Sequence, residues 1–353
     1  MKENMKENRT KYDAVIIGFG KGGKTMAGAL GAAGKKVALI ERSSKMYGGT
    51  CINVGCIPTK SLVYRAGLAA AKGGSFEEKA AAYKAAMEQK EDLTARLRGK
   101  NYQKLDSSPN ITVIDGTASF QSPHVVEVEK DGRTFQVEGE QIFINTGSSA
   151  FIPPIEGLKG NPYVYTSEGL LNLTRLPARL VIIGGGYIGV EFSSIYASFG
   201  SKVTILQDGD VFLPREDEEI AGAVRESLES RGIHVMTGVR VKALEQAEGR
   251  ALVVVDTGKE VQKLEAEAVL VATGRRPNTA GLNLEAAGVQ VGPRGGIVTD
   301  DSLTTTAPHI YAMGDVRGGL QFTYISLDDF RIVKSKVLGD GSYTLKKRGA
   351  VPY

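Results

Sequence analysis

The sequence predicts an α/β protein built from two Rossmann-like halves, and three observations lead to this prediction. Two glycine-rich stretches, GFGKGG and GGGYIG, each follow a short apolar run and precede a helical segment. Apolar runs of strand length alternate with helical segments along most of the chain, which is typical of parallel sheets with helices on their faces. The chain of 353 residues is also long enough for two or more hydrophobic cores.

The first βαβ unit begins at Tyr12. The run DAVIIGFGKGG predicts a buried strand that ends in a glycine turn, followed by a helix over about residues 24–33 and a second strand, KVALIE. The glycines of the turn are Gly18, Gly20 and Gly23. Their backbone N–H groups and the helix dipole can hold a pyrophosphate, and Glu41 ends the second strand, where it can accept a hydrogen bond from a ribose hydroxyl.

A second unit of the same design begins at Leu180 with LVIIGGGYIGVEF, the helical SSIYASFG and the strand KVTILQ. Its glycines are Gly184, Gly186 and Gly189. The second strand ends in Gln207, a neutral residue that neither favours the 2′-hydroxyl of NAD nor repels the 2′-phosphate of NADP strongly. Two such sites imply two bound dinucleotides, one of them a flavin that passes electrons on, and leave the choice between NADH and NADPH open.

The remaining segments complete the predicted architecture. Residues 64–105 are rich in Ala, Lys and Glu and predict one helix or a helical pair, and DGR at 131–133 indicates a hairpin between two strands. A final helix is expected over 326–338. We expect a flexible leader at 1–11, a discontinuous first domain at 12–150 and 280–353, and a second domain at 151–279.

Both cysteines of the chain lie in GGTCINVGCIPTK, a loop that runs into a predicted helix. Half a metal site or two inert thiols are the alternatives to a reactive pair, but a closed structural site needs about four ligands and the histidines are scattered in the sequence without ligand spacing. We therefore expect no metal and a redox dithiol of Cys51 and Cys56. A helix N-terminus favours the thiolate, and Pro58 suits the first helical turn. Lys60 could add a positive charge to that of the helix N-terminus, or it is simply an exposed lysine.

Composition narrows the partners and the compartment. No run of eighteen apolar residues occurs, and the N-terminal MKENMKENRTK is charged, so neither a membrane span nor a signal peptide is predicted. The net charge is only +4, and the basic residues are interspersed with acidic ones, which argues against nucleic acid as a partner. From the lack of a predicted span or signal peptide we expect a cytoplasmic protein, and in that reducing compartment a close cysteine pair is more often catalytic than structural.

Taken in order, these motifs resemble the pyridine nucleotide-disulfide oxidoreductases, the flavoproteins that include dihydrolipoamide dehydrogenase, glutathione reductase and mercuric reductase. The resemblance covers nearly the whole chain from Tyr12 onward. Its specific parts are the first fingerprint with Glu41, GGTCINVGCIPTK, GGGYIGVE, ATGRRPN at 272–278 and AMGDV at 312–316. The resemblance implies a glutathione-reductase-like fold, FAD and NAD(P)H as cofactors, and hydride flow from NAD(P)H through FAD to the cysteine pair.

The resemblance also assigns roles to single residues. Cys56 would lie against the flavin as the charge-transfer thiol, and Cys51 would be the interchange thiol. Lys60 would pair with Glu191 near the flavin N5, and Asp315 would bind the ribityl chain. The residues implied at the FAD site are Gly18, Gly20, Gly23, Glu41, Thr50, Ala118, Gly147, Gly314 and Asp315. Those implied at the NAD(P)H site are Gly184, Gly186, Gly189, Gln207 and Gly274.

The acceptor is less constrained. GFGKGGKT, MYGGTCINVGCIPTK and GGLQFTYISLDDFRIV are most similar to flavoproteins of reactive-chlorine resistance, which implies copper(II) or an oxidant-linked acceptor. A dihydrolipoamide dehydrogenase-type enzyme and an FAD-binding redox sensor without turnover are the alternatives. Family members continue into an interface domain that builds a homodimer and carries a His-Glu pair. We expect that domain to be absent here, the homodimer to be weakened or lost, and full turnover to be reduced.

Overall fold

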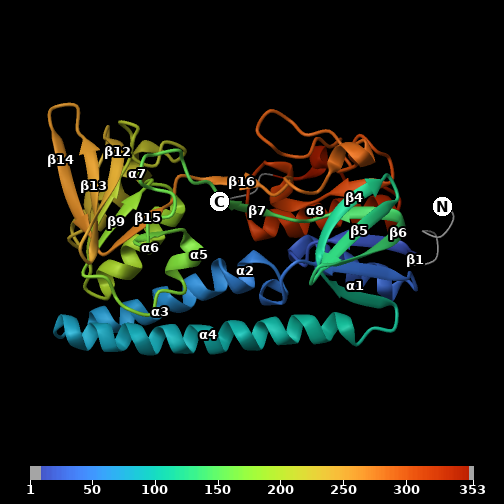
Figure 1. Ribbon diagram of the computed structural model, residues 1–353, viewed down its shortest axis with the longest axis horizontal. Helices are drawn as coiled ribbons and strands as arrows, with labels where there is room; N and C mark the ends of the chain where they lie inside the picture. The colour runs from blue at the N-terminus through green and yellow to red at the C-terminus, as the bar shows by residue number, and fades with distance from the viewer. Residues whose placement is uncertain (1–8, 350–353) are drawn as a thin grey trace. The chain divides into compact units, whose positions relative to one another are not determined.

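The computed structural model describes residues 9–349, which form two compact units (Figure 1). The first unit contains residues 9–53, 95–149 and 276–349, and the second contains 54–94 and 150–275. This division differs from the expected domains because residues 54–94 belong to the second unit. Leu62 and Tyr83 of this segment are buried in one hydrophobic cluster with Phe192 and Tyr196. The Tyr83 hydroxyl also donates to the carbonyl of Leu173 at 2.5 Å.

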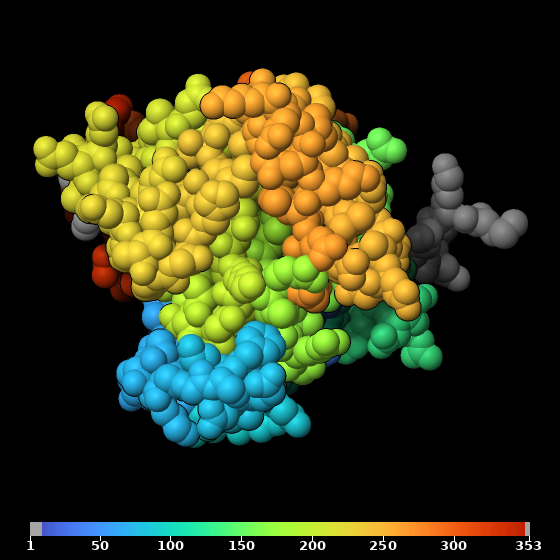
Figure 2. All heavy atoms as spheres, turned by 90° about the vertical axis from the view of Figure 1, so that its left-hand side faces the viewer, coloured from blue at the N-terminus to red at the C-terminus, as the bar shows by residue number. Residues whose placement is uncertain are grey.

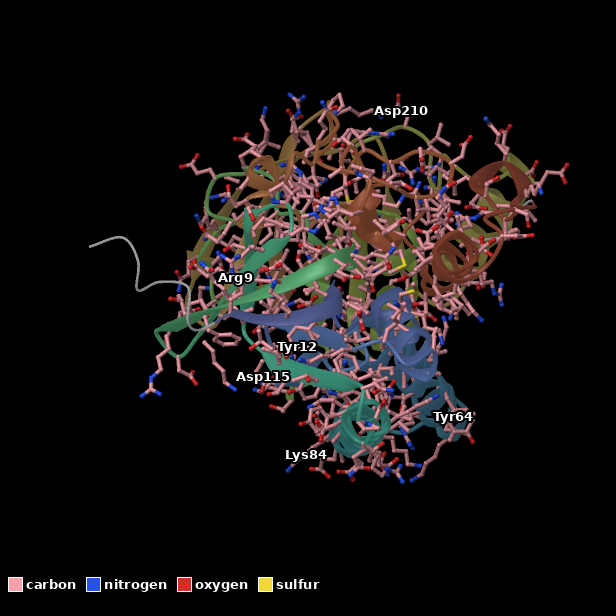
Figure 3. The ribbon with its side chains drawn as sticks, turned by 90° about the vertical axis from the view of Figure 1, so that its right-hand side faces the viewer. Arg9, Tyr12, Tyr64, Lys84, Asp115 and Asp210 are labelled. Atoms are coloured by element: carbon pink, nitrogen blue, oxygen red, sulfur yellow. The ribbon has the colours of Figure 1, made fainter. Side chains whose placement is uncertain are left out.

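The flexible leader expected at 1–11 does not include residues 9–11. Arg9–Lys11 already belong to strand β1, where Arg9 lies opposite Gln136 and Lys11 opposite Glu138 of β6. Arg9 and Tyr12 of this strand are labelled in Figure 3. Strand pairing, which the local polar sequence did not indicate, thus extends β1 by three residues. Residues 1–8 lie outside the described part of the chain.

The first unit is built on a seven-stranded sheet in the order β3-β2-β1-β6-β5-β4, with β17 also paired to β6. The strands are β1 (Arg9–Ile17), β2 (Val37–Glu41), β3 (Ile111–Asp115), β4 (Thr117–Ser122), β5 (Val125–Lys130), β6 (Arg133–Ile144) and β17 (Ile310–Ala312). Strands β3, β2, β1, β6 and β17 are parallel, whereas β4, β5 and β6 form an antiparallel meander. Asp131 and Gly132 have positive φ angles of 52° and 75° at the β5–β6 turn, which confirms the predicted hairpin.

Helices and short turns connect these strands. The first unit contains α1 (Lys21–Ala32), η1 (Ser44–Met46), α2 (Thr50–Asn53), η2 (Leu284–Ala287), η3 (Gly314–Arg317), α8 (Thr323–Leu338) and η4 (Leu345–Lys347). Helices α1 and α8 pack against each other, and their apolar faces share one buried cluster that includes Met26, Leu30, Phe330 and Val333. The predicted final helix therefore begins three residues earlier than expected, at Thr323.

The second unit has a parallel sheet in the order β11-β10-β9-β15-β8. Its strands are β8 (Val164–Tyr165), β9 (Arg179–Ile183), β10 (Lys202–Leu206), β11 (His234–Met236) and β15 (Ala268–Val271). An antiparallel sheet follows β11 and consists of β12 (Arg240–Ala247), β13 (Arg250–Asp256) and β14 (Val261–Ala266). Its helices are α3 (Cys56–Lys72), α5 (Ser167–Leu170), α6 (Tyr187–Ser198) and α7 (Glu218–Glu229), and α4 (Phe76–Asp106) contributes its first part. Short strands β7 (Ser148–Ala150) and β16 (Arg275–Pro277) lie where the chain passes between units.

Residues 64–105 thus form most of a helical pair, as predicted, and α4 alone is 31 residues long. Figure 2 shows the second unit with its helical residues 54–94 in blue, below the yellow and orange residues of β12–β14. Helix α3 packs against α6, the helix that follows the second glycine turn. This packing brings residues from the cysteine segment and from the second fingerprint into one unit.

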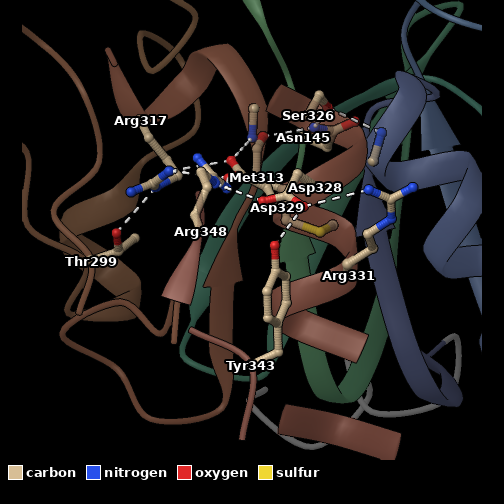
Figure 4. Close-up of polar contacts among 12 residues, drawn as sticks. Asn145, Thr299, Met313, Arg317, Ser326, Asp328, Asp329, Arg331, Tyr343 and Arg348 are labelled. Atoms are coloured by element: carbon tan, nitrogen blue, oxygen red, sulfur yellow. Dashed lines mark hydrogen bonds and ion pairs between the residues drawn. The ribbon is translucent and has the colours of Figure 1, made fainter. Parts of the chain in front are cut away.

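A buried ion cluster fixes the loop between β17 and α8 in the first unit (Figure 4). The side chain of Asp329 is fully buried, and its carboxylate accepts a hydrogen bond from the backbone N–H of Gly314 at 2.7 Å. Arg317 contacts the same carboxylate at 3.2 Å, and Arg348 donates to its other oxygen. Arg348 also donates to Asp328 at 2.6 Å. Two guanidinium groups therefore compensate the burial of Asp329 and hold Gly314 in place.

Replacing Asp329 by Asn should destabilise the first unit strongly, because both arginines would lose a buried counter-charge. We expect the free energy of unfolding to fall by about 3–5 kcal/mol, the range for removing one partner of a buried ion pair. Chemical denaturation followed by circular dichroism measures this change. Asp301→Asn, which breaks the exposed pair with Lys346, should cost only about 0–1 kcal/mol. Equal, small effects of both substitutions would contradict the proposed role of the cluster.

Candidate functional site

The two glycine turns are built on the same plan, one in each unit. Gly18 follows β1 and donates to the carbonyl of Ile40 at 2.8 Å, and Gly184 follows β9 and donates to the carbonyl of Leu206 at 2.8 Å. Both have positive φ angles, 105° and 110°. A Cβ on Gly18 would lie 2.3 Å from the carbonyl oxygen of Asn145. No side chain fits there, so each turn brings its backbone unusually close to a neighbouring strand.

The third glycine of each fingerprint allows the helix to approach the turn. A Cβ on Gly23 would lie 2.3 Å from the carbonyl oxygen of Gly18, and one on Gly189 would lie 2.2 Å from that of Gly184. The helices α1 and α6 begin after Gly20 and Gly186, neither of which carries a side-chain cap. The predicted strand–turn–helix geometry is therefore present twice, and a helix N-terminus in this position is suited to an anion.

In both units, the residue at the end of the second strand of the βαβ unit accepts a hydrogen bond from the glycine turn. Glu41 accepts a hydrogen bond from the backbone N–H of Phe19 at 2.9 Å, and Gln207 accepts one from Gly185 at the same distance. Glu41 is 8% exposed, and burial raises the pKa of its carboxyl although the backbone amides of Phe19 and Ser43 oppose that shift. One carboxylate thus stabilises its own glycine turn, and its expected contact with a ribose remains a prediction.

Two residues that sequence reasoning missed hold the first fingerprint. The Asn145 side chain accepts from the N–H of Gly23 at 2.8 Å and donates to the carbonyl of Met313 at 2.6 Å. The Ser326 hydroxyl accepts from the N–H of Gly22 at 3.1 Å. Asn145 stands just after β6, and a polar residue at the carboxyl end of a central parallel strand is a signal that could have identified it. Ser326 carries no such local signal, because it lies inside α8.

The other positions implied for FAD all fall in the first unit. Thr50 begins α2, Ala118 is buried in β4, Gly147 follows β6 with a φ of 73°, and Gly314 begins η3 with a φ of 74°. The carboxylate of Asp315 accepts from the Ser148 hydroxyl at 2.8 Å. These residues fit a flavin dinucleotide, because a glycine turn without side chains leads into α1, whose helix dipole favours a phosphate at its start.

The positions implied for NAD(P)H fall in the second unit. A Cβ on Gly186 would meet nothing within 4 Å, so open space faces the start of α6. Gly274 follows β15 with a φ of 113° and is equally open. This unit therefore fits a second dinucleotide at the same edge of its own parallel sheet.

The cysteines stand at the two sides of a helix start. Cys51 lies in α2 and is half-buried, whereas Cys56 is exposed and is the first residue of α3, with Gly55 as the N-cap. Pro58 lies in the first turn of α3, as predicted. Cys51 belongs to the first unit and Cys56 to the second. The helix dipole of α3 thus favours negative charge at Cys56.

Lys60 lies one turn after Cys56, and its ammonium forms an ion pair with the carboxylate of Glu191 on α6. The side chain of Lys60 is 71% exposed and that of Glu191 is 28% exposed. The pairing that the resemblance implied is therefore confirmed, while the role of the pair beside a flavin stays a prediction.

Two of the three histidines, scattered in the sequence, meet in the structure. The rings of His124 and His309 stack with centroids 3.8 Å apart and planes 16° apart. Each ring also contacts a backbone carbonyl, His124 that of Gly139 and His309 that of Pro123. Imidazole lone pairs lie in the ring plane, so nearly parallel rings do not aim at one ion. Over residues 9–349, no group of three or more His, Cys, Asp or Glu side chains is arranged to hold a metal.

None of the helices between residues 9 and 349 has the length and apolar character that crossing a bilayer requires.

Comparison with known proteins connects these sites. The profile of the pyridine nucleotide-disulphide oxidoreductase family matches residues 12–329. The chain is 49% identical to the probable pyridine nucleotide-disulfide oxidoreductase RclA of Escherichia coli K12, over 97% of this chain and 74% of that protein. It is 38% identical to a mercuric reductase of Bacillus cereus, over 94% of this chain and 53% of the relative. A dihydrolipoyl dehydrogenase of Bacillus subtilis is 35% identical, over 92% and 71%.

A solved structure of a relative has the same fold as this chain. The Cu(II) complex of the HOCl-induced flavoprotein disulfide reductase RclA from Escherichia coli superposes with a TM-score of 0.91 at 48% identity, covering 98% of this chain and 75% of that one. Members of the family are homodimeric flavoproteins that use FAD and NAD(P)H and act on small molecules. With the double dinucleotide-binding fold and the family profile in agreement, the chain belongs to the pyridine nucleotide-disulphide oxidoreductases.

Proposed function

We propose that this protein takes hydride from NAD(P)H and passes two electrons, by way of FAD, to a redox disulfide of Cys51 and Cys56 and then to a small acceptor. The observation that carries the proposal is the placement of Cys56 as the first residue of α3, one turn before the Lys60–Glu191 ion pair. A cation, a helix N-terminus and a thiol in one segment are what a thiolate-based redox pair requires.

The chain's own residues would bind and orient the cofactors. Gly18, Gly20 and Gly23 would hold the FAD pyrophosphate at the start of α1, and Glu41 would contact the ribose while it keeps its hydrogen bond to Phe19. Asn145 and Ser326 hold the start of α1 by accepting hydrogen bonds from its backbone N–H groups. FAD, when bound, supplies a centre that accepts hydride and delivers electrons to a disulfide.

The thiols would then carry the electrons to the acceptor. Reduction of the disulfide by two electrons breaks the S–S bond and leaves one thiolate, which the N-terminus of α3 stabilises at Cys56, and one thiol after uptake of a proton. Cys51 would be the thiol that meets the acceptor. Reoxidation transfers two electrons to the acceptor, releases the proton and re-forms the disulfide bond.

We propose copper(II) as the acceptor, with two Cu(II) ions each taking one electron and becoming Cu(I). The support is the 48% identity to a flavoprotein disulfide reductase whose solved structure is a Cu(II) complex. A dihydrolipoamide dehydrogenase-type activity is the second candidate, because a dihydrolipoyl dehydrogenase matches at 35% identity. A cytoplasmic location is a further proposal.

Anaerobic addition of one equivalent of NADH should produce a long-wavelength charge-transfer band in the visible spectrum. The band is expected because the Cys56 thiolate would donate charge to the oxidised flavin once the disulfide is reduced. In Cys56→Ser the flavin should bleach without this band, which makes that variant the matched control. Retention of a fully oxidised flavin in the wild-type protein would instead favour a redox sensor without turnover.

Acceptor choice can be measured in the same anaerobic preparation. The NADH-reduced protein should reduce Cu(II) to Cu(I), detected with a Cu(I)-specific chelator, faster than it reduces lipoamide. Cys51→Ser should lower the Cu(II) rate by about 100-fold or more, since the interchange thiol is the covalent participant. Faster turnover with lipoamide than with Cu(II) would replace the first candidate acceptor with the second.

NADH should be used in preference to NADPH. The carboxylate of Asp208 is exposed next to Gln207 and accepts from its side-chain amide at 3.1 Å, so it would repel a 2′-phosphate. We expect Asp208→Asn to lower the ratio of kcat/KM for NADH to that for NADPH by about threefold to fivefold, the size of effect that an exposed charge has. Glu260→Gln, on the turn before β14, removes an equal charge and should leave the ratio unchanged. A preference for NADPH in the wild-type protein would contradict the proposed repulsion between Asp208 and the 2′-phosphate.

A further inference from the structure

Side chains clamp the loop that leads into Cys51. Gly48 and Gly49 have positive φ angles of 94° and 83°. The amide of Asn53 donates to the carbonyls of Tyr47 at 3.0 Å and Gly49 at 2.9 Å. The ammonium of Lys24 donates to the carbonyl between them, that of Gly48, at 3.1 Å. Three consecutive carbonyls thus each accept from a side chain, and one of these donors is charged.

Lys24 is a half-buried cation on α1 that the first fingerprint does not require. Its second acceptor is the side-chain oxygen of Asn101 on α4, at 2.7 Å. Both acceptors are neutral, so neither cancels the charge of the ammonium. Arg98, one turn earlier on α4, donates to Asn53 at 2.9 Å and completes the support of the loop from the same helix.

The charged groups that face Lys24 come from three elements. Burial lowers the pKa of its ammonium to about 8, and the like charges of Lys21 on α1 and Lys104 on α4 act in the same direction. Cys51 on α2 acts in the opposite direction, because a thiolate there would favour the protonated lysine. The interaction is reciprocal, so a protonated Lys24 favours the thiolate form of Cys51.

We propose that Lys24 is a positioning residue whose ammonium, held over the Gly48 carbonyl, supplies the positive charge that stabilises the Cys51 thiolate. The inference rests on the proposed function, in which Cys51 is the thiol that meets the acceptor. It gives the interchange thiol a cation from the FAD-binding helix α1, independent of the α3 N-terminus that serves Cys56.

The test measures the reactivity of Cys51 directly. In the FAD-loaded Cys56→Ser protein, Cys51 is the only thiol of the chain. Its rate of alkylation by iodoacetamide is measured against pH, with Lys24 intact and in the Lys24→Gln background. We expect the midpoint of this profile to move to higher pH by about one unit, which lowers the thiolate fraction near pH 7 about tenfold.

The two profiles should differ near pH 7 and meet at high pH. A thiolate with a higher pKa is more nucleophilic, by about threefold for one unit, so Lys24→Gln should react about threefold more slowly at pH 7. On the alkaline plateau the two rates should agree, because Lys24, with a pKa of about 8, has lost its charge there. Lys24→Arg keeps the charge and should follow the parent profile near pH 7. Lys45→Gln removes an exposed lysine six residues before Cys51 and should change nothing.

Superimposable profiles for Lys24→Gln and the parent would overturn the inference, and so would a rate lowered by one factor at every pH. Lys24→Met, which keeps the buried stem without the charge, is measured beside Lys24→Gln so that poor folding of one variant does not decide the result. Alkylation requires neither NADH nor an acceptor. Failure of the flavin titration with a shifted alkylation profile would therefore reject the proposed function alone, and the reverse result would reject the role of Lys24 alone.

Discussion

The close approach of the first glycine turn to the end of β6 is the constraint on which the first unit depends. Gly18 lies against the backbone of Asn145 so closely that any side chain would overlap it. The side chain of Asn145 then reaches Gly23 of α1 and Met313 after β17. One short contact therefore sets the positions of a strand, a helix and the loop that carries Asp315.

Burial of charge near this contact has a free-energy cost that the surroundings offset. Asp329 is fully buried because Arg317, Arg348 and the Gly314 N–H surround its carboxylate. Lys24, by contrast, has only neutral acceptors, and its burial, followed by the like charges of Lys21 and Lys104, lowers the pKa of its ammonium. The first arrangement fixes a loop, whereas the second leaves a cation whose charge responds to the state of a neighbouring thiol.

The second unit repeats the first with one chemical change. Glu41 and Gln207 accept from equivalent backbone amides, each 22 residues before it in the chain. The geometry is kept because the glycine turn needs an acceptor there, whereas only Glu41 carries a charge. One backbone design thus occurs twice, with a charged acceptor in the first unit and a neutral one in the second.

The sequence by itself determined the features that depend on local geometry. The sequence predicts the two glycine turns, the Asp131–Gly132 turn, the start of α3 near Cys56 and the pairing of Lys60 with Glu191. Each follows from backbone conformations and short-range patterns that a few neighbouring residues impose, or from a motif characteristic of the family.

Only the tertiary structure decided the contacts between distant segments. Ser326 supports Gly22 across 304 residues, residues 54–94 join the second unit through buried side chains, and Arg9 extends β1 because β6 lies beside it. The hydrogen bonds and apolar surfaces involved are satisfied by partners far away in the chain. No local pattern specifies such partners, because burial and charge compensation arise only when the folded segments meet.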